Sequence, residues 1–269
     1  MRTVVKVSGT PIEHPERCPA LWAALAQAAG AHELAIVHGG GRAVDERLAR
    51  LGLETSKVDG VRITPADQIG VVAGVLAGEV NRGLVAALTK AGGRVAGIGL
   101  SDAGLCVCRA IDERVYGRVG RVVESDGSVV HALWSAGVTP VVHSIGQDEA
   151  GPLNVNADEA AAGVARAVGA HRLVLLTDVA GVLNDAGAKL GVLDAAGAEA
   201  LIGSGVIGGG MAVKVRSALS AAALAGCEVV IASWDEAPGL LANDKSTDAG
   251  TRIVATASER MDDLARGPA

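Results

Sequence analysis

Two glycine triplets, and a lysine that follows the second one, have the types and spacing to do chemistry. Gly39–Gly41 in "VHGGGRAVDE" follow an apolar β-branched run, and Gly208–Gly210 in "GSGVIGGGMAVKV" open an expected helix that carries Lys214. Glycine has no Cβ, so consecutive glycines let the backbone approach an anion closely. A tight turn usually needs only one glycine. We therefore predict an anion-binding loop at the first triplet and an anion contact for Lys214.

Lys6 is a further candidate, because it ends the apolar run of "TVVKVSGT", shortly before Ser8 and Gly9. A lysine at the end of a buried strand must either reach solvent or meet a negative partner. This stretch alone leaves both interpretations open.

Asp158 and two asparagines lie together in "GPLNVNADEAAAGVA". In an extended chain Asn154, Asn156 and Asp158 point to one side, and Asp158 is near an expected helix start. An ordinary N-cap accounts for Asp158 but not for the asparagines. Residues 177–185, "TDVAGVLND", follow another apolar run and indicate either a plain turn or a ligand loop.

Two lysines, two glycine triplets and one aspartate together predict a site for a phosphate group in transit. Phosphoryl transfer asks the protein mainly for positioning and for neutralisation of charge. A G-x-G-x-x-G match at Gly203, Gly205 and Gly208 does not indicate a dinucleotide site, because a helix rather than a strand precedes it. Walker A, H-E-x-x-H and G-x-S-x-G motifs do not occur in the sequence.

The elements that must position these residues alternate between strand and helix. The expected strands are Thr3–Val7, Leu34–Val37, Val95–Ile98, Val138–Val142, Arg172–Leu176 and Glu228–Ala232. The expected helices are Cys18–Ala29, Ala43–Leu51, Ala66–Lys90, Asp158–Val168 and Met211–Ala225. This pattern predicts an α/β fold with an open, mainly parallel sheet covered on both faces. Ligands of such sheets bind beyond the carboxyl ends of the strands, where each candidate lies.

Two stretches break the alternation. Residues 105–130 hold short strand-like pieces with turn signals at Asp112–Glu113 and Asp126–Gly127, which predict hairpins standing off the sheet. Gly146–Asn156 is expected to be a polar turn stretch before a helix. The change of pattern near Ala170 suggests a boundary between two lobes.

Composition narrows the class of protein. The chain has 269 residues, of which 49% are hydrophobic and 1% aromatic, and its net charge is −6. Few aromatic residues and no basic excess argue against nucleic-acid binding. No uninterrupted apolar run of membrane-spanning length occurs, and four cysteines indicate a reduced, cytoplasmic protein. Cys106 and Cys108 are expected on one face of a strand, without the further ligands that a metal site needs.

In combination these segments resemble the amino acid kinase family, and within it the short bacterial enzymes that phosphorylate N-acetyl-L-glutamate. The resemblance runs nearly end to end. It rests on "VVKVSG", "VHGGG", "GVRITPADQI", "LAGEVNRGLVAAL", "VVHSIGQDEAGPLNVNAD", "LLTDVAGVL", "GGMAVKV", "VVIASW" and "GTRIV", which occur in family order. It implies a three-layer sandwich in two lobes, and transfer of phosphate from ATP with Mg²⁺ to the substrate's side-chain carboxylate, the second step of arginine biosynthesis.

The resemblance also implies roles for residues. Lys6 and Lys214 would flank the γ-phosphate, and Asp158 would hold both lysines. Phosphoryl oxygens would be bound by the backbone N–H groups of Gly9, Gly40 and Gly41. The substrate would be bound by Gly40, Gly41, Arg62 and Asn154. The ATP pocket would be lined by Asp178, Val179, Gly181, Val182, Leu183, Val206, Ile207 and Gly208. Mg²⁺ would be held mainly by the nucleotide phosphates, so no protein metal ligand is expected.

By the same resemblance, residues 1–170 would form the substrate, phosphoryl and dimerisation lobe, and residues 171–269 the ATP lobe. The chain begins just before its first expected strand, and we expect a homodimer without arginine feedback. Ser8 departs from the family, which has a second glycine there. The serine would cost backbone freedom if the position needs a left-handed conformation, or alternatively its hydroxyl would contact a phosphate. The alternatives are a kinase for a related acylated or carrier-bound aminoadipate or glutamate, and a non-catalytic nucleotide- or amino-acid-binding regulator.

Overall fold

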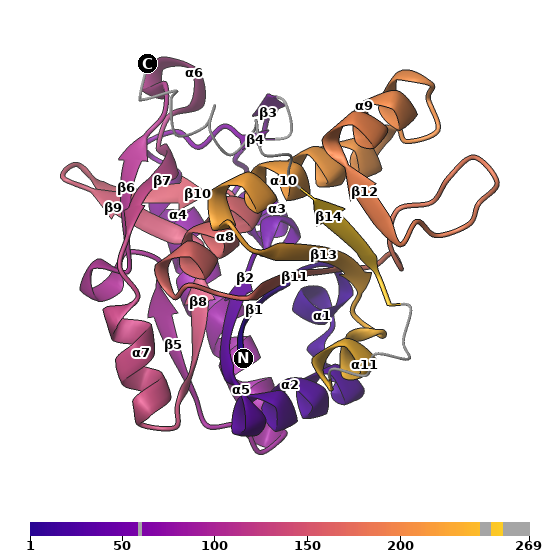
Figure 1. Cartoon of the computed structure of the whole chain (residues 1–269). Coiled ribbons are helices and arrows are strands. Elements are labelled where there is room, and N and C mark those ends of the chain that lie inside the picture. Colours follow the sequence, from indigo (N-terminus) through magenta and orange to yellow (C-terminus); the bar gives the residue numbers. More distant parts are fainter. Residues whose placement is uncertain (59–60, 243–248, 255–269) are drawn as a thin grey trace.

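A computed structural model describes residues 1–58, 61–242 and 249–254, and an eight-stranded sheet crosses the whole molecule (Figure 1). Its strands are β1 Arg2–Val7, β2 Glu33–His38, β5 Val95–Gly99, β8 Thr139–His143, β11 Arg172–Thr177, β12 Val192–Asp194, β13 Glu228–Ser233 and β14 Thr251–Val254. They lie in the order β12-β14-β13-β11-β1-β2-β8-β5. Only the β13–β14 pair is antiparallel, so the prediction of a mainly parallel sheet is confirmed.

The central strands are buried on both faces, as parallel strands under helices must be. Val4, Val5 and Val7 of β1 are fully buried, and the other central strands follow the same pattern. The six expected strands are recovered to within one residue at each end. The strands β12 and β14 were not expected; they extend one edge of the sheet and reverse its direction there.

Helices cover both faces and make the three layers that the resemblance implies. One face carries α2 Pro19–Ala31, α3 Gly41–Arg50, α4 Ile69–Ala73, the π-helical turn η2 Gly74–Val80, α5 Asn81–Lys90 and α11 Ala237–Leu241. The other carries α7 Ser128–Ser135, α8 Ala157–Ala167 and α10 Gly209–Ala225, with α9 Ala195–Gly203 beside α10. The short helical segments are α1 Thr10–Glu13, η1 Pro15–Arg17, η3 Asp102–Gly104 and α6 Glu113–Tyr116.

A separate four-stranded sheet lies over α8. It consists of β6 Cys106–Ala110, β7 Val119–Ser125, β9 Ile145–Asp148 and β10 Gly151–Val155, in the order β6-β7-β10-β9. The antiparallel β6–β7 pair confirms the expected hairpin off the main sheet. The prediction of a polar turn stretch over Gly146–Asn156 is wrong, because these residues form most of a second hairpin, β9–β10. The strand β10 also pairs with β7, a contact between distant segments that the local pattern does not show. A two-stranded ribbon, β3 Lys57–Val58 and β4 Val61–Arg62, completes the strands.

The continuous helical stretch Ile69–Lys90 is, among the described residues, the one helix long and apolar enough to cross a membrane by length and composition. Glu79 and Arg82 interrupt it. Its apolar side packs into the core under the main sheet, through Ile69, Val72, Val75, Leu76, Val80, Leu84, Val85 and Leu88. This is the burial pattern of an amphipathic helix that covers a sheet.

Candidate functional site

A pocket of about 260 Å³ lies at the carboxyl ends of β1 and β2. The two strands pair in register, Lys6 opposite Val37 and Val7 opposite His38, so the loops that follow them leave the sheet side by side. The pocket brings together eight residues that the sequence singles out, namely Lys6, Gly39, Gly40, Gly41, Arg62, Asn154, Asn156 and Asp158. Ser8 also lines it.

An ion pair joins Lys6 to Asp158 in the pocket wall. Lys6 Nζ lies 2.9 Å from Asp158 Oδ1, and the two side chains are only 13% and 21% exposed. Asn156 is the N-cap of α8 and accepts hydrogen bonds from the backbone N–H groups of Asp158 and Glu159. The capping role considered for Asp158 therefore belongs to Asn156, and the Asp158 carboxylate is available to Lys6.

The loop after β1 is held from β11. Gly9 has φ 73°, a left-handed conformation, and a Cβ there would lie 2.1 Å from Asp178 Oδ2. Thr10 donates its backbone N–H to Asp178 Oδ1 at 3.0 Å. Ser8 does not have a positive φ, and its hydroxyl donates to the Leu176 carbonyl at 2.8 Å. Ser8 therefore costs no backbone strain.

The loop after β2 is tightly packed. A Cβ on Gly40 (φ 157°) would lie 2.8 Å from Leu76 Cδ2. Gly41 begins α3, whose first N–H groups have no partner within the helix. Arg62 donates to the Gly41 carbonyl at 2.8 Å and forms an ion pair with Asp45. Burial by itself raises the pKa of Asp45, but hydrogen bonding to Arg62 and its charge outweigh burial, so the pKa is lowered and the carboxylate is ionised.

Asn154 is oriented by neighbours on other segments. Its side-chain Nδ2 donates to Thr64 Oγ1 at 3.0 Å, and the Thr64 hydroxyl donates to the Arg62 carbonyl at 3.3 Å. Its backbone N–H donates to the Arg118 carbonyl at 2.9 Å. Thr64 thus links the side chain of Asn154 to the backbone of Arg62, the other residue expected to recognise the substrate.

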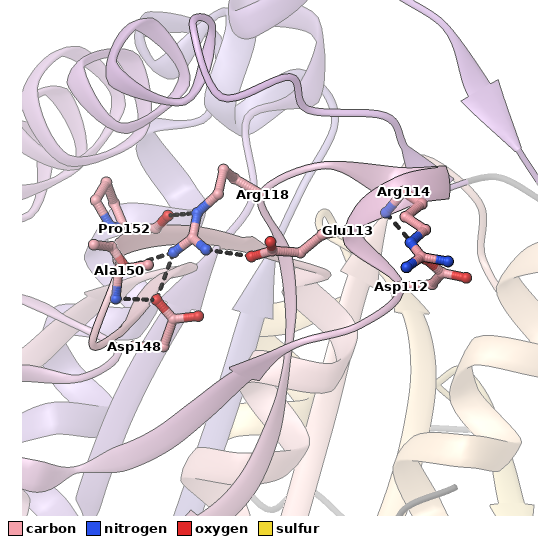
Figure 2. Close-up of polar contacts among 8 residues, drawn as sticks. Asp112, Glu113, Arg114, Arg118, Asp148, Ala150 and Pro152 are labelled. Atoms are coloured by element: carbon pink, nitrogen blue, oxygen red, sulfur yellow. Dashed lines mark hydrogen bonds and ion pairs between the residues drawn. The ribbon is translucent and has the colours of Figure 1, made fainter.

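Arg118, at the junction of α6 and β7, fixes the β9–β10 hairpin (Figure 2). Its guanidinium group donates to Glu113 at 2.6 Å, Asp148 at 2.5 Å and the Gly151 carbonyl at 3.1 Å, and its side chain is only 10% exposed. Burial raises the pKa of Asp148, but hydrogen bonds from Arg118 and the turn amides outweigh burial and lower it. Asp45, Thr64 and Arg118 were not predicted from the sequence. Only the first two had a local signal, since they stand within quoted motifs.

Lys214 reaches the same end of the sheet from α10. Its Nζ donates to Thr177 Oγ1 at 2.6 Å, at the carboxyl end of β11, the neighbour of β1. The resemblance implies that Asp158 holds both lysines. In the part of the chain that the structure describes, Asp158 forms its ion pair with Lys6, whereas Lys214 donates to Thr177.

The residues expected around ATP divide into buried and open ones. Val182 and Ile207 are 0% and 3% exposed and belong to the core, and Val182 donates its N–H to Thr251 Oγ1 at 2.8 Å. Leu183 and Val206 are exposed apolar side chains. Asp178 is exposed and accepts hydrogen bonds from Thr10 and Trp234. Val179 is half-buried and Gly181 is buried. Gly208 is the exposed N-cap of α10.

Carboxylates, histidines and thiols could in principle add a metal site or a nucleophile. No group of three or more His, Cys, Asp or Glu side chains within residues 1–58, 61–242 and 249–254 is arranged to hold a metal ion. Cys106 and Cys108 are both buried on one face of β6, as expected. Burial raises the pKa of Cys106 to about 12, so its thiol stays protonated.

The sequence matches known proteins over most of its length. Residues 1–233 match the amino acid kinase family. An acetylglutamate kinase of Vibrio cholerae is 42% identical over 234 residues, 86% of this chain and 88% of its own. An acetylglutamate kinase of Photorhabdus laumondii is 40% identical over 255 residues, 94% of this chain and 98% of its own.

Solved structures share the fold. The smu.665 protein of Streptococcus mutans superposes with a TM-score of 0.77 at 28% identity, over 94% of this chain and 98% of its own. N-acetylglutamate synthase of Neisseria gonorrhoeae superposes with a TM-score of 0.75 at 23% identity, over 95% of this chain and 60% of its own.

Proposed function

The chain belongs to the amino acid kinase family, and from that premise we propose that the pocket beside Lys6 transfers the γ-phosphoryl group of ATP to the side-chain carboxylate of N-acetyl-L-glutamate. The product is the acyl phosphate N-acetyl-L-glutamyl 5-phosphate, and the reaction is the second step of arginine biosynthesis. The two relatives at 42% and 40% identity, each named acetylglutamate kinase, support this substrate.

The observation that carries the proposal is the Lys6–Asp158 ion pair in the wall of a cationic pocket. The lining includes three cations, Lys6, Lys57 and Arg62, and one carboxylate, Asp158. N-acetyl-L-glutamate brings two carboxylates, and the phosphoryl group in transit is also negative. The pocket therefore has the charge that both reactants need.

The substrate is held by Arg62 and Asn154 together with the Gly40–Gly41 backbone. Arg62 is fixed by Asp45 and the Gly41 carbonyl, and its planar guanidinium group suits a carboxylate. Asn154 lines the same pocket and is oriented by Thr64. Its amide can pair with the substrate's α-carboxylate or acetamido group.

In the transfer step an oxygen of the substrate's side-chain carboxylate attacks the γ-phosphorus, the bond to the β–γ bridging oxygen breaks, and ADP leaves. Lys6 and Lys214 face the transferring group and offset its negative charge, while Asp158 keeps Lys6 in place. The N–H groups of Gly9, Gly40 and Gly41 bind phosphoryl oxygens. Mg²⁺ would be held by the nucleotide phosphates rather than by side chains of this chain, and would supply further neutralisation of their charge.

The nucleotide lies against the carboxyl end of β11 and the start of α10. The exposed apolar side chains of Leu183 and Val206 offer surface for the adenine base, over the buried Val182 and Ile207. Asp178, Val179, Gly181 and Gly208 complete this side of the site. A cytoplasmic homodimer belongs to the same proposal by the family resemblance, and light scattering of the purified protein checks the dimer.

Coupled ADP release tests the function. We expect turnover with N-acetyl-L-glutamate well above that with glutamate, aminoadipate and N-acetylaminoadipate. Lys214→Ala should lower kcat by about 10²–10³, the usual cost of losing one transition-state contact. Lys90→Ala, which removes an exposed lysine at the end of α5, should leave kcat unchanged. ATP binding without turnover of any of these substrates would contradict the proposal and support a regulator.

A further inference from the structure

His38 is a completely buried polar residue directly under the Gly39–Gly41 loop. It ends β2, is 0% exposed, and lies beside β8 and the start of α5. Burial lowers its pKa to about 4, with the neighbouring His143 acting in the same direction, so its ring is neutral at physiological pH. The reaction proposed above does not use this ring as a contact to any reactant.

Two hydrogen bonds fix the ring. His38 Nδ1 lies 2.8 Å from the Gly39 carbonyl oxygen, and His38 Nε2 lies 3.0 Å from Asn81 Nδ2. Asn81, itself 2% exposed, donates from the same Nδ2 to the Val141 carbonyl at 2.9 Å. The packing is close, because a Cβ on Gly97 would lie 2.0 Å from Asn81 Oδ1.

This chain of contacts sets where the ring proton lies. A carbonyl oxygen only accepts hydrogen bonds, so the end of the Asn81 amide that faces the Val141 carbonyl must be its NH₂ group. The same NH₂ group faces His38 Nε2. Asn81 then donates to Nε2, which must be the unprotonated ring nitrogen. The ring proton is therefore on Nδ1, which donates a hydrogen bond to the Gly39 carbonyl oxygen.

The Gly39 carbonyl in turn sets the direction of the next N–H group. In a trans peptide the N–H of residue 40 points opposite to the C=O of residue 39. With that carbonyl drawn toward His38, the Gly40 N–H points away from the core, and Gly39, Gly40 and Gly41 line the pocket. Within the described residues this N–H has no protein hydrogen-bond partner. Leu76 and Val80, at 2.8 and 3.0 Å from a Cβ placed on Gly40, pack directly against the loop.

We propose that His38 and Asn81 are positioning residues for phosphoryl transfer: they hold the Gly39–Gly40 peptide so that the Gly40 N–H is directed at the incoming phosphoryl oxygen. The role rests on the proposed kinase function. Because folding already orients this N–H donor, no free energy is needed to orient it during the reaction step.

The ring tautomer of the wild-type protein tests the arrangement without any variant or substrate. Long-range ¹H–¹⁵N spectra of protein labelled with ¹⁵N-histidine should show His38 as the Nδ1–H tautomer, the minor form of free histidine. An Nε2–H tautomer or a charged ring at pH 7.5 would overturn the inference. Because this readout needs no turnover, it stands apart from any failure of the kinase proposal.

Two substitutions test the role in transfer. In His38→Asn the amide nitrogen takes the place of Nδ1 and can still donate to the Gly39 carbonyl, whereas in His38→Gln it takes the place of Nε2 and cannot. We expect His38→Gln to lower kcat about tenfold to a hundredfold, less than the loss of a whole donor, with smaller changes in KM. His38→Asn should recover most of kcat.

Folded fractions of both variants are compared by circular dichroism, so that a loss of folded protein is not counted as a loss of turnover. Equal kcat values for the two variants per folded molecule would overturn the inference. Wild-type turnover, measured alongside, tests the kinase proposal separately.

Discussion

The two glycine triplets look alike in the sequence and differ in the structure. A Cβ added to Gly39, Gly40 or Gly41 would lie within 3.6 Å of a neighbouring side chain. A Cβ added to any residue of Gly208–Gly210 would have open space around it. The first triplet is built into a packed pocket, and the second opens toward the volume where we place the nucleotide.

The same contrast holds for the residues around the triplets. Lys6 is largely buried and paired with Asp158, whereas Lys214 stands on an exposed part of α10. The substrate side of the site is therefore preformed, and substitutions there should cost both stability and activity. On the nucleotide side, substitutions should affect nucleotide binding or phosphoryl transfer with little change in stability.

The largest contrast should come from alanine in each triplet. Gly40→Ala combines a positive φ with contacts of 2.8 and 3.0 Å, and we expect it to lower the free energy of unfolding by about 3 kcal/mol. Gly208 has φ −135° and open space around it, so Gly208→Ala should change the free energy of unfolding by less than about 0.5 kcal/mol. Urea unfolding measures both. Equal losses in the two variants would show that the contrast between the triplets is false.

A matched pair of arginines extends the comparison, one just before β7 beside the pocket and one on the exposed face of α10. Arg118→Met removes a 10% exposed side chain from its acidic partners Asp148 and Glu113, and should cost about 2 kcal/mol because a partly buried carboxylate is left unpaired. Arg216→Met removes an exposed pair with Glu199 and should cost less than about 1 kcal/mol. Thermal unfolding measures both. KM for N-acetyl-L-glutamate should rise only in Arg118→Met, and a larger loss in Arg216→Met would contradict this account.

The support of the first triplet should also respond to pH. The pKa of His38 is lowered from 6.5 to about 4, so between these values the unfolded chain binds more protons and the stability of the fold decreases as pH falls. The lost stability should reach about 2 kcal/mol between pH 7.5 and pH 5.

Urea unfolding of the wild type and His38→Asn at both pH values isolates this effect, because His143, whose pKa burial also lowers, contributes to both proteins. Identical pH dependence in the two proteins would show that His38 does not titrate this way.

The smallest effect should be at Ser8. Its φ is not in the left-handed region, and its hydroxyl already has a partner in the Leu176 carbonyl. Ser8→Gly should therefore change kcat by less than about twofold and remove only one hydrogen bond worth about 1 kcal/mol. A gain in kcat of tenfold or more would show that the serine impairs transfer.

Regular elements and loop positions could be predicted from the sequence, because both depend on local pattern. Apolar β-branched runs predicted six of the eight strands of the main sheet, and glycines marked the loops at Gly9 and Gly39–Gly41. The β9–β10 hairpin was missed because the polar residues at its turn dominate the local pattern, while its pairing to β7 depends on residues far along the chain.

The partners of the candidate site could not be predicted, because they come from distant segments. Asn154 meets Thr64 across 90 positions of sequence, and Lys214 meets Thr177 across 37. Asn156 rather than Asp158 caps α8. That exchange depends on where the helix begins, a boundary that sequence patterns place only to within a few residues.

Trapping of the acyl phosphate shows whether this pocket phosphorylates the side-chain carboxylate. The purified protein, ATP, Mg²⁺ and N-acetyl-L-glutamate are incubated with hydroxylamine, which converts an acyl phosphate to a hydroxamate, and hydroxamate and ADP are both counted. We predict one hydroxamate for each ADP in the wild type, and a rate about 10²–10³ lower in Lys6→Ala. ADP formed without hydroxamate, or a Lys6→Ala rate equal to the wild type, would contradict phosphoryl transfer to the carboxylate in this pocket.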